Sequence, residues 1–429
     1  MGNLLANVKF VNMNKLTLLL SSLLVANLAA AQPLPPVSAT EAGFSPDGLS
    51  RIDKFFDREI KANRVPGAVM AIARDGKLVY FKAFGSIDPS KGTPMPTDAV
   101  FALASMTKIM TSVAALQLNQ EGRLPLKSLL SDYYPGFAAM KVGVALPDGT
   151  LRLDAQSRPI FIQDLFRHTS GLIYGGRGDH PISKLYPNGT QPALEGSTSD
   201  FISTITKLPL AHQPGTAFEY SFSTDVLGAV VEKVSGQKLG AYLQDSVWKP
   251  LGMVDTMFMV PPEKRARIAH PFALNPLDGK PQSIPLINQQ SKFDCGGACA
   301  FSTVADYLRF GQMLVNGGSL EGKQILSPKI VANMTSNHLG PAIRNTVSQI
   351  EQHREGYGFG LGVAVRTEPG MAAVPGSVGE YSWNGAYGTV FFADPKEKLV
   401  VVVGTAAPGE IRKYYREQVQ ALVYGAMTR

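Results

Sequence analysis

The sequence predicts a mixed α/β fold of the α+β type, with one antiparallel sheet flanked by helices and assembled from both ends of the chain. Three observations predict it: an early pair of β-rich runs, a group of β-rich runs near the C-terminus, and a helix at each end of this set. Between the two groups of strands, from about residue 123 to residue 290, the chain is rich in proline, glycine and short helical patches. We expect this stretch to form an inserted helical subdomain.

The N-terminal elements follow from apolar periodicity and turn residues. GAVMAIARDGKLVYFKAFG consists of two β-rich runs around an Arg-Asp-Gly turn, which predicts a hairpin. The segment FALASMTKIM (101–110) continues into an apolar helix that ends at Gly122. Before the hairpin, FSPDGLSRIDKFFDREIKA predicts a helix whose apolar face carries Leu49, Ile52, Phe55, Phe56 and Ile60.

The C-terminal part of the chain predicts the remaining strands. We expect strands within 357–366, 380–395 and 398–406, and a final helix over roughly 409–426. The predicted organisation is therefore an N-terminal part of the α/β domain over 32–122, the helical subdomain over 123–290, and a C-terminal part of the α/β domain over 291–429.

The first 31 residues resemble a secretory signal peptide. Lys9 and Lys15 precede the apolar run 16–31, which closes with three alanines, Ala29 to Ala31. This run is shorter than the ~20 residues of a membrane span. We expect cleavage after Ala31, export to the periplasm or the medium, and no stable membrane span in the mature protein. Met13 is an alternative start residue.

Composition and residue spacing argue against several classes of function. The formal net charge of +7 is spread along the chain without a basic run, so nucleic-acid binding is not predicted. The six histidines show no metal-ligand spacing, and Cys295 and Cys299 lack the partner pair of a zinc site, so we expect neither a metal nor a cofactor. An exported protein could bridge these two cysteines, but we interpret both as small residues in a tight glycine loop.

Three stretches fit the spacing S-x-x-K, which pairs a nucleophile with a base: Ser105–Lys108, Ser235–Lys238 and Ser246–Lys249. Only the first opens a long apolar helix, where positions i and i+3 share a face and the first amides are free. Ser105 is therefore the candidate nucleophile and Lys108, pushed toward its neutral form by burial, the candidate proton acceptor. A helix cap followed by a buried lysine is an equally good interpretation of these residues alone.

Two further segments favour a catalytic interpretation. Tyr220 in PGTAFEYSFSTDVLG lies between a turn and an apolar helix, where a tyrosine beside a lysine can relay a proton. In WNGAYGT, expected in a central strand, Gly385 lets a substrate approach the backbone, so the Ala386 amide could bind an oxyanion beside that of Ser105. A packed tyrosine and a buried Trp383 beside a glycine kink are the structural alternatives.

In this order, the Ser105–Lys108, Tyr220 and Trp383–Gly385 segments resemble the serine β-lactamase and penicillin-binding superfamily, and most closely its family VIII carboxylesterases. This resemblance implies a β-lactamase/transpeptidase-like fold, a nucleophilic Ser105, Lys108 as base and Tyr220 as proton relay. It also implies backbone oxyanion donors at Ser105 and Ala386. Substrate-binding positions would be Phe222, Trp383, Asn384 and Gly385.

The sequence departs from class C β-lactamases at two of these positions. Phe222 stands where their Tyr-x-Asn motif ends, and Trp383-Asn384-Gly385 replaces their Lys-Thr-Gly. The second change removes a cation that would bind a substrate carboxylate and adds an apolar wall. We therefore expect hydrolysis of small, neutral, short-chain esters, with possible weak activity on cephalosporins. The oligomeric state is left open.

Other functional assignments remain as alternatives. His168 and Asp164 invite a Ser-His-Asp interpretation, but the chain contains no Gly-x-Ser-x-Gly elbow, so we expect His168 to be structural in a loop that lines the site. A β-lactamase or D-Ala-D-Ala peptidase would use the same catalytic chemistry on a different substrate. A non-catalytic penicillin-binding-like sensor would be expected to have lost Ser105, Lys108 or Tyr220.

Overall fold

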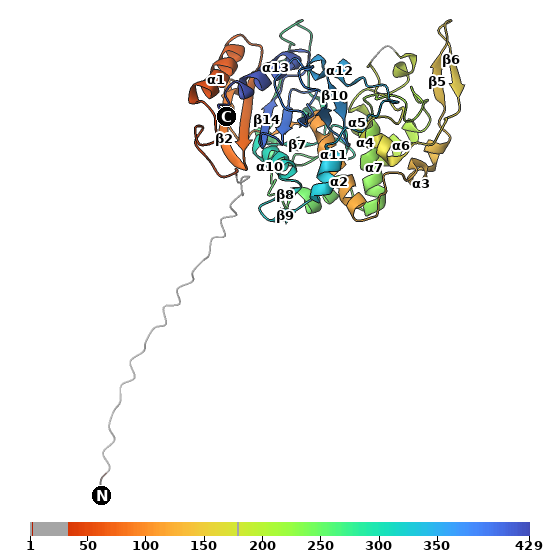
Figure 1. Ribbon diagram of the computed structural model, residues 1–429, viewed down its shortest axis with the longest axis horizontal. Helices are drawn as coiled ribbons and strands as arrows, with labels where there is room; N and C mark the ends of the chain where they lie inside the picture. The colour runs from red at the N-terminus through yellow and green to blue at the C-terminus, as the bar shows by residue number, and fades with distance from the viewer. Residues whose placement is uncertain (1, 3–32, 178–179) are drawn as a thin grey trace.

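The computed structural model describes Gly2, residues 33–177 and residues 180–429. Apart from Gly2, the predicted signal segment 1–31 lies outside the described residues. Figure 1 shows the strands of the main sheet on one side of the molecule and the helices α4, α6 and α7 on the other. The hydrophobic core extends through both regions.

The main sheet joins the two ends of the chain, as the sequence predicts. It has eight strands in the order β10-β11-β12-β13-β14-β1-β2-β3, and every neighbouring pair is antiparallel. The two ends of the chain meet where β1 pairs with β14, with Met70 opposite Val403. The strands are β1 Gly67–Arg74, β2 Lys77–Asp88, β3 Thr93–Pro94, β10 Tyr357–Phe359, β11 Ala364–Arg366, β12 Tyr381–Ser382, β13 Val390–Asp394 and β14 Leu399–Thr405.

Both faces of this sheet are covered, because β1 and β14 are apolar on both sides. Ala68, Met70 and Ile72 face a cluster formed with α1 (Pro46–Lys61) and α13 (Ile411–Tyr424), which pack on each other. The alternate residues of β1, at 69, 71 and 73, join the larger cluster that includes α10 (Val304–Val315) and α2 (Thr107–Gln120). This alternation follows from the two-residue period of a strand.

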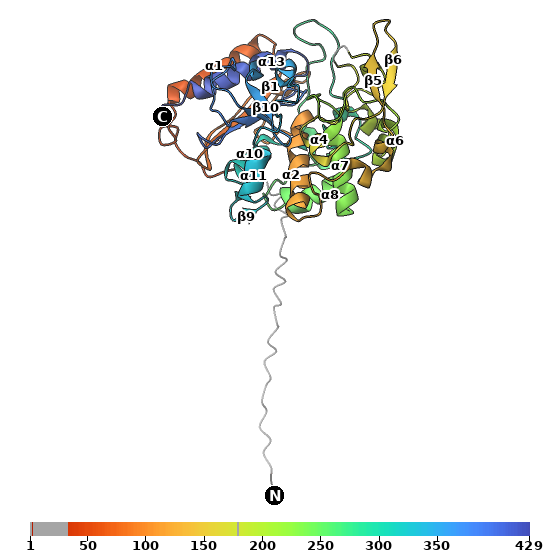
Figure 2. The same ribbon diagram turned by 45° about the vertical axis from the view of Figure 1, so that its right-hand side comes forward.

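The helical region lies beside α2, which separates it from the sheet (Figure 2). Helix α2 is buried on nearly all sides, and it contacts α7 (Ser223–Ser235) and α8 (Leu239–Leu243). The other helices are α3 Leu130–Tyr133, α4 Ile162–Phe166, α5 Gln191–Glu195, α6 Thr198–Ile205, α9 Pro285–Asn288, α11 Pro328–Met334 and α12 Val347–Ile350. Short two-stranded ribbons pair β4 Phe101–Ala102 with β7 Phe301–Ser302, β5 Val142–Ala145 with β6 Leu151–Asp154, and β8 Ser319–Leu320 with β9 Lys323–Gln324.

The C-terminal strands are shorter than the sequence predicts. The run 357–366 divides into β10 and β11, and the run 380–395 divides into β12 and β13. A tight turn ends β12, because the Gly385 amide donates to the Thr389 carbonyl and the Gly388 amide donates to the Gly385 carbonyl. Because β12 ends at Ser382, the expectation that Trp383, Asn384 and Gly385 lie in a strand is wrong: they follow β12 and lead into the turn at 386–388, although the Trp383 amide still donates to the Phe391 carbonyl of β13.

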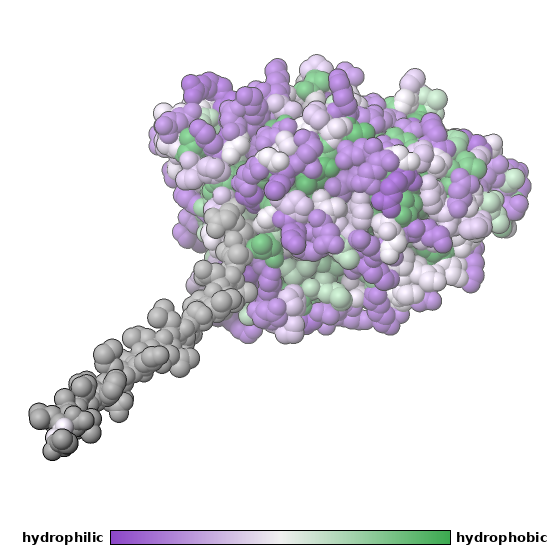
Figure 3. All heavy atoms as spheres, turned by 90° about the horizontal axis from the view of Figure 1, so that it is seen from below, coloured by the Kyte–Doolittle hydropathy of each residue, from purple (hydrophilic) through white to green (hydrophobic). Residues whose placement is uncertain are grey.

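On the face in Figure 3, hydrophilic side chains predominate and apolar ones form small separate areas. Within the described part of the chain, no helix is both long and apolar enough to cross a membrane.

Candidate active site

Ser105 lies in a turn that immediately precedes α2. The ribbon of β4 and β7 fixes the chain just before it, and residues Ala104–Met106 form a single 3₁₀ turn. Ala104 has φ of +46°, a left-handed conformation that is costly for a residue with a Cβ. Such strain is retained where the surrounding structure enforces it, commonly at functional sites. Ser105 is therefore held at the N-terminal end of a buried helix, as the sequence predicts.

The turn after β12 lies directly against the Ser105 segment. The Leu103 carbonyl accepts a hydrogen bond from Thr389 Oγ1 at 3.0 Å. A Cβ on Gly385 would lie 2.2 Å from the same carbonyl oxygen, so only glycine fits there. This close approach brings the predicted oxyanion donors to one place.

Most of the predicted site residues line a narrow cavity of about 30 Å³: Ser105, Tyr220, Trp383, Asn384, Gly385 and Ala386. Among the described residues, the amides of Ser105 and Ala386 donate no hydrogen bond within the protein, so both are free to bind an oxyanion. Two predicted residues do not line this cavity. Phe222 packs edge-on against Tyr174, with ring centroids 4.3 Å apart, and Lys108 lies deeper.

Tyr220 connects the cavity with Lys108. The Trp383 indole Nε1 donates to Tyr220 Oη at 3.0 Å, which orients the phenol. Lys108 Nζ lies 4.6 Å from the centroid of the Tyr220 ring. The three residues therefore form a contiguous set, although they come from α2, the segment before α7 and the turn after β12.

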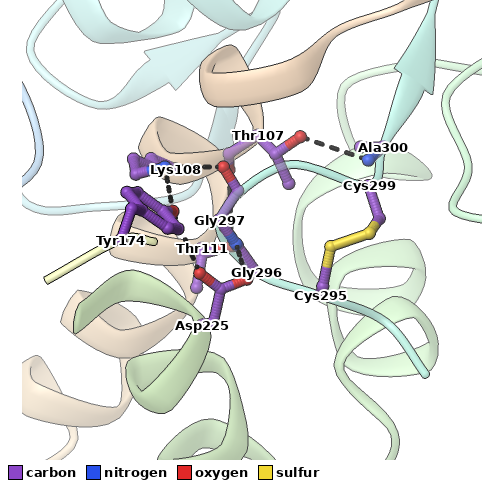
Figure 4. Close-up of a disulfide and its surroundings, with 10 residues drawn as sticks. All are labelled: Thr107, Lys108, Thr111, Tyr174, Asp225, Cys295, Gly296, Gly297, Cys299 and Ala300. Atoms are coloured by element: carbon purple, nitrogen blue, oxygen red, sulfur yellow. Dashed lines mark hydrogen bonds between the residues drawn. A yellow bond between two sulfur atoms is a disulfide. The ribbon is translucent and has the colours of Figure 1, made fainter. Parts of the chain in front are cut away.

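The buried Lys108 amine is part of a closed ring of hydrogen bonds (Figure 4). Lys108 Nζ donates to the Gly297 carbonyl at 2.7 Å and to Tyr174 Oη at 3.1 Å. Asp225 completes the ring, since Tyr174 Oη donates to its Oδ2 at 3.2 Å and the Gly297 amide donates to its Oδ1 at 3.0 Å. Burial raises the pKa of Asp225, and Lys108 opposes this shift. Burial and Asp225 together raise the pKa of Tyr174 well above its usual value.

The loop that carries Gly297 is closed by a disulfide between Cys295 and Cys299. The prediction of a tight glycine loop is correct, but the interpretation of the cysteines as merely small residues is wrong. A Cβ on Gly297 would lie 2.2 Å from Asp225 Oδ2, and the Gly296 carbonyl accepts from Thr111 Oγ1 at 2.8 Å. The loop is therefore fitted between α2 and α7, where it holds the Lys108 amine.

Removing this disulfide should lower the turnover number by more than the loss of stability alone explains. We expect the double variant Cys295→Ala/Cys299→Ala to lower kcat several-fold, because the Gly297 carbonyl is no longer held against Lys108. The five-residue loop contributes about 2 kcal/mol to the unfolding free energy. Two measurements check this: Tm of the variant, and its kcat on an ester of the short-chain class that the sequence predicts.

The matched control is Ile52→Ala on the far face of the sheet, which costs about 2–5 kcal/mol without touching this loop. If kcat is unchanged in the double variant, or falls equally in the double variant and in Ile52→Ala, the disulfide acts only on stability.

His168 has a structural position, as the sequence predicts, although it does not line the cavity. It is fully buried, and its Nδ1 accepts from the Ser221 amide at 3.3 Å, next to Tyr220. Burial and, to a smaller extent, Lys108 lower its pKa well below the usual value. Asp164 bonds instead to Arg158, Arg167 and Thr169. The structure thus contains no His168–Asp164 pair among its hydrogen bonds in the described residues.

Charged residues that the sequence analysis did not identify also line the Ser105 cavity: Arg177, Glu351, Arg354, Arg412 and Arg416. The Arg354 guanidinium lies 4.4 Å from the centroid of the Trp383 ring. The inference that replacing the lysine by Trp383 leaves this pocket without a cation is therefore wrong. Nothing in the spacing of these arginines along the chain indicates that they meet, because they come from separate loops and from α13.

Within residues 33–177 and 180–429, no group of three or more His, Cys, Asp or Glu side chains is arranged to hold a metal ion. The polar atoms near Ser105 are instead amides, a phenol, an amine and guanidinium groups, a set that suits acyl transfer.

A family model described as Beta-lactamase matches residues 52–423. The chain belongs to the β-lactamase family. Esterase EstB of Burkholderia gladioli is 30% identical over 403 residues, which cover 86% of this chain and 93% of that protein. Lovastatin esterase of Penicillium rubens is 31% identical over 371 residues, which cover 81% and 90% of the two chains.

Solved structures of this family share the fold. EstCE1, described as a hydrolase with promiscuous acyltransferase activity, matches with a TM-score of 0.73 and 28% identity. The match covers 88% of this chain and 98% of EstCE1. The predicted superfamily, its resemblance to family VIII esterases and the fold class are confirmed.

Proposed function

We propose that the protein is a serine carboxylesterase that hydrolyses short-chain carboxylic esters through an acyl-enzyme on Ser105. The observation that carries this proposal is the shared cavity of Ser105, Tyr220 and the free amides of Ser105 and Ala386, with the Lys108 amine directly behind the Tyr220 ring. The esterase names of two relatives and the hydrolase description of EstCE1 support it.

In acylation, the Ser105 hydroxyl attacks the ester carbonyl carbon and transfers its proton to Lys108, directly or through Tyr220. A neutral lysine amine has two N–H groups and one lone pair. The Gly297 carbonyl and Tyr174 Oη use both N–H groups, which leaves the lone pair for the incoming proton. The amides of Ser105 and Ala386 stabilise the tetrahedral oxyanion.

The same groups complete the reaction. The tetrahedral intermediate collapses, the bond to the alcohol oxygen breaks, and this oxygen takes the proton back through Tyr220. Water then attacks the acyl-enzyme carbonyl carbon and gives a proton to the same base. The second tetrahedral intermediate collapses, the bond to Ser105 Oγ breaks, and this oxygen takes the proton from the base, which releases the acid and free Ser105. The Trp383 indole N–H, hydrogen-bonded to Tyr220 Oη, stabilises negative charge on this oxygen during each transfer.

The cavity favours esters over lactams and peptides. Phe222 packs against Tyr174 and offers no hydrogen bond to a substrate amide. The cavity beside Ser105 is narrow, which favours short acyl chains. A β-lactamase or D-Ala-D-Ala peptidase remains the second candidate because it would use the same serine, lysine and tyrosine.

A comparison of three substrates tests the proposal. We expect the purified protein to turn over p-nitrophenyl butyrate rapidly, nitrocefin weakly and a D-Ala-D-Ala peptide not at all. Nitrocefin turnover as fast as that of the ester would favour the β-lactamase assignment. A protein that turns over none of the three but binds them would favour the non-catalytic sensor.

We further propose that the mature protein is exported. The basic and apolar pattern of residues 1–31 and the Cys295–Cys299 disulfide support this location, because disulfides persist mainly in oxidising compartments. Mass spectrometry of the N-terminus of the protein from its native host tests cleavage after Ala31.

A further inference from the structure

Arg354 is a buried cation whose hydrogen-bonding capacity is not fully used. Its side chain is 1% exposed, and within the described residues its Nε and Nη1 donate no hydrogen bond. Glu351 Oε2 lies 3.4 Å from Nε, but this carboxylate also pairs with Arg416 and accepts from Asn384 Nδ2. Unpaired donors on a buried charge are costly, so they indicate a ligand that the cavity receives.

Arg412 is a second cation on the wall of the same cavity. Its Nη1 donates to the Gly409 carbonyl, and its Nη2 lies 3.3 Å from a carboxylate oxygen of the exposed Glu410, whereas Glu351 is paired with Arg354 and Arg416. Burial, together with the neighbouring Arg416, lowers the pKa of both Arg354 and Arg412. His353 adds no charge at neutral pH, since burial lowers its pKa to about 4. An anion bound by the two arginines would offset the repulsion that each of them experiences from Arg416.

The positive wall continues outward from Ser105. A second cavity of about 480 Å³ adjoins the first, because Arg177, Ile350 and Arg412 line both. Its other charged residues include Arg344 and Lys413, opposed by two carboxylates. A substrate can therefore extend from Ser105 into a larger cavity that also carries excess positive charge.

We propose that the ester which this enzyme prefers carries a carboxylate group, bound by Arg354 and Arg412 beside Trp383. The inference rests on the esterase function proposed above and replaces the expected preference for neutral esters. Guanidinium groups suit this ligand, because their planar donors match the geometry of a carboxylate. An uncharged ester of the same shape would leave Nε and Nη1 of Arg354 without a hydrogen-bond acceptor.

A matched pair of esters tests the proposal on the alcohol side of the scissile bond. 3-(Butyryloxy)benzoate and 3-(butyryloxy)benzamide have nearly the same shape and differ in charge. The phenyl esters of 4-carboxybenzoic acid and of 4-carbamoylbenzoic acid form the corresponding pair on the acyl side. We expect kcat/KM to favour the carboxylate about tenfold to a hundredfold in at least one pair, the range of a charge-assisted contact.

Variants assign the effect to the two arginines. Arg354→Met and Arg412→Met should bring the carboxylate-to-carboxamide ratio toward one, and Arg354→Lys should keep part of it. Arg51→Met, on the exposed side of α1, is the matched control and should keep the wild-type ratio. Because Arg412 lies at the edge of the cavity, its variant remains informative if the buried Arg354→Met fails to fold.

Two results would overturn the proposal: wild-type ratios of one or less in both pairs, or a carboxylate preference that survives both methionine variants. Loss of activity on both members of a pair, with the ratio unchanged, would show that the arginines instead stabilise the transition state.

A binding measurement separates this proposal from the esterase assignment. 3-(Butyramido)benzoate, a non-ester analogue, should change the fluorescence of Trp383 and bind at least tenfold more tightly than its carboxamide. If p-nitrophenyl butyrate is not hydrolysed, the esterase proposal fails while this titration still decides whether the anion site exists. Equal affinity for the two analogues would refute the anion site whatever the activity.

Discussion

Replacing Ser105 by alanine should reduce ester hydrolysis by about 10⁴–10⁶-fold, because residues that act as a catalytic unit lose most of their effect when the nucleophile is removed. The fold should remain intact, since Ser105 is only partly buried and the 3₁₀ turn is held by backbone pairing of β4 and β7. The measurement is the initial rate on p-nitrophenyl butyrate, together with Tm.

The chain provides two matched controls for this variant. Ser235 and Ser246 occupy the same position in the other S-x-x-K stretches, but the structure places them at the end of α7 and beyond α8. Ser235→Ala and Ser246→Ala should keep nearly full activity. A fluorophosphonate probe should label wild-type protein and not Ser105→Ala. If Ser105→Ala kept more than about 1% of the activity, another residue would be the nucleophile.

Replacing Lys108 by methionine should lower kcat by roughly 10⁴-fold, within the range for loss of a member of a catalytic unit. Methionine keeps an unbranched side chain in the buried space but has no amine to accept the Ser105 proton. The change also leaves the Gly297 carbonyl and the Tyr174 hydroxyl without their donor, which costs about 1–3 kcal/mol of stability. Turnover and Tm together separate these two effects.

Lys238→Met and Lys249→Met are the corresponding controls, since both lysines are exposed. They should leave kcat unchanged. If the Lys108→Met protein folds and retains near-normal turnover, Tyr220 alone acts as the base. The same serine reactivity toward the fluorophosphonate probe in wild type and Lys108→Met would lead to the same conclusion.

The candidate site residues that the sequence indicates lie where recognisable local structures begin. Ser105 and Lys108 have the spacing of one helical face at the start of an apolar helix, and Tyr220 precedes another helix, in the order that resembles the superfamily. Gly297 could not be found in this way, because it acts through its backbone carbonyl and any glycine in a loop has the same appearance. Asp225 lies inside α7, where an acidic residue is normally solvated, yet here it is buried.

The sheet shows a similar division. The β1–β2 hairpin was predictable because each run is long and its turn contains a glycine. The predicted C-terminal strands were too long because glycines at 360, 362, 385 and 388 interrupt the apolar runs. Apolar character alone does not distinguish a buried turn from a strand. The arginines of the cavity gave no signal at all, since their meeting depends on tertiary structure.

The pairing of β1 with β14 can form only after nearly the whole chain has been synthesised. Thr405 Oγ1 donates to the Gly67 carbonyl across 338 residues of sequence, and α13, which supplies Arg412 and Arg416, follows that strand. A chain emerging from the ribosome therefore contains Ser105, the proposed nucleophile, for most of synthesis without the turn that bears Ala386 and without Arg412 and Arg416. Contacts so distant in sequence form slowly. The proposed hydrolytic activity is thus a property of the finished polypeptide, and proteolytic loss of α13 would remove Arg412 and Arg416 from the cavity wall while sparing Ser105, the proposed nucleophile.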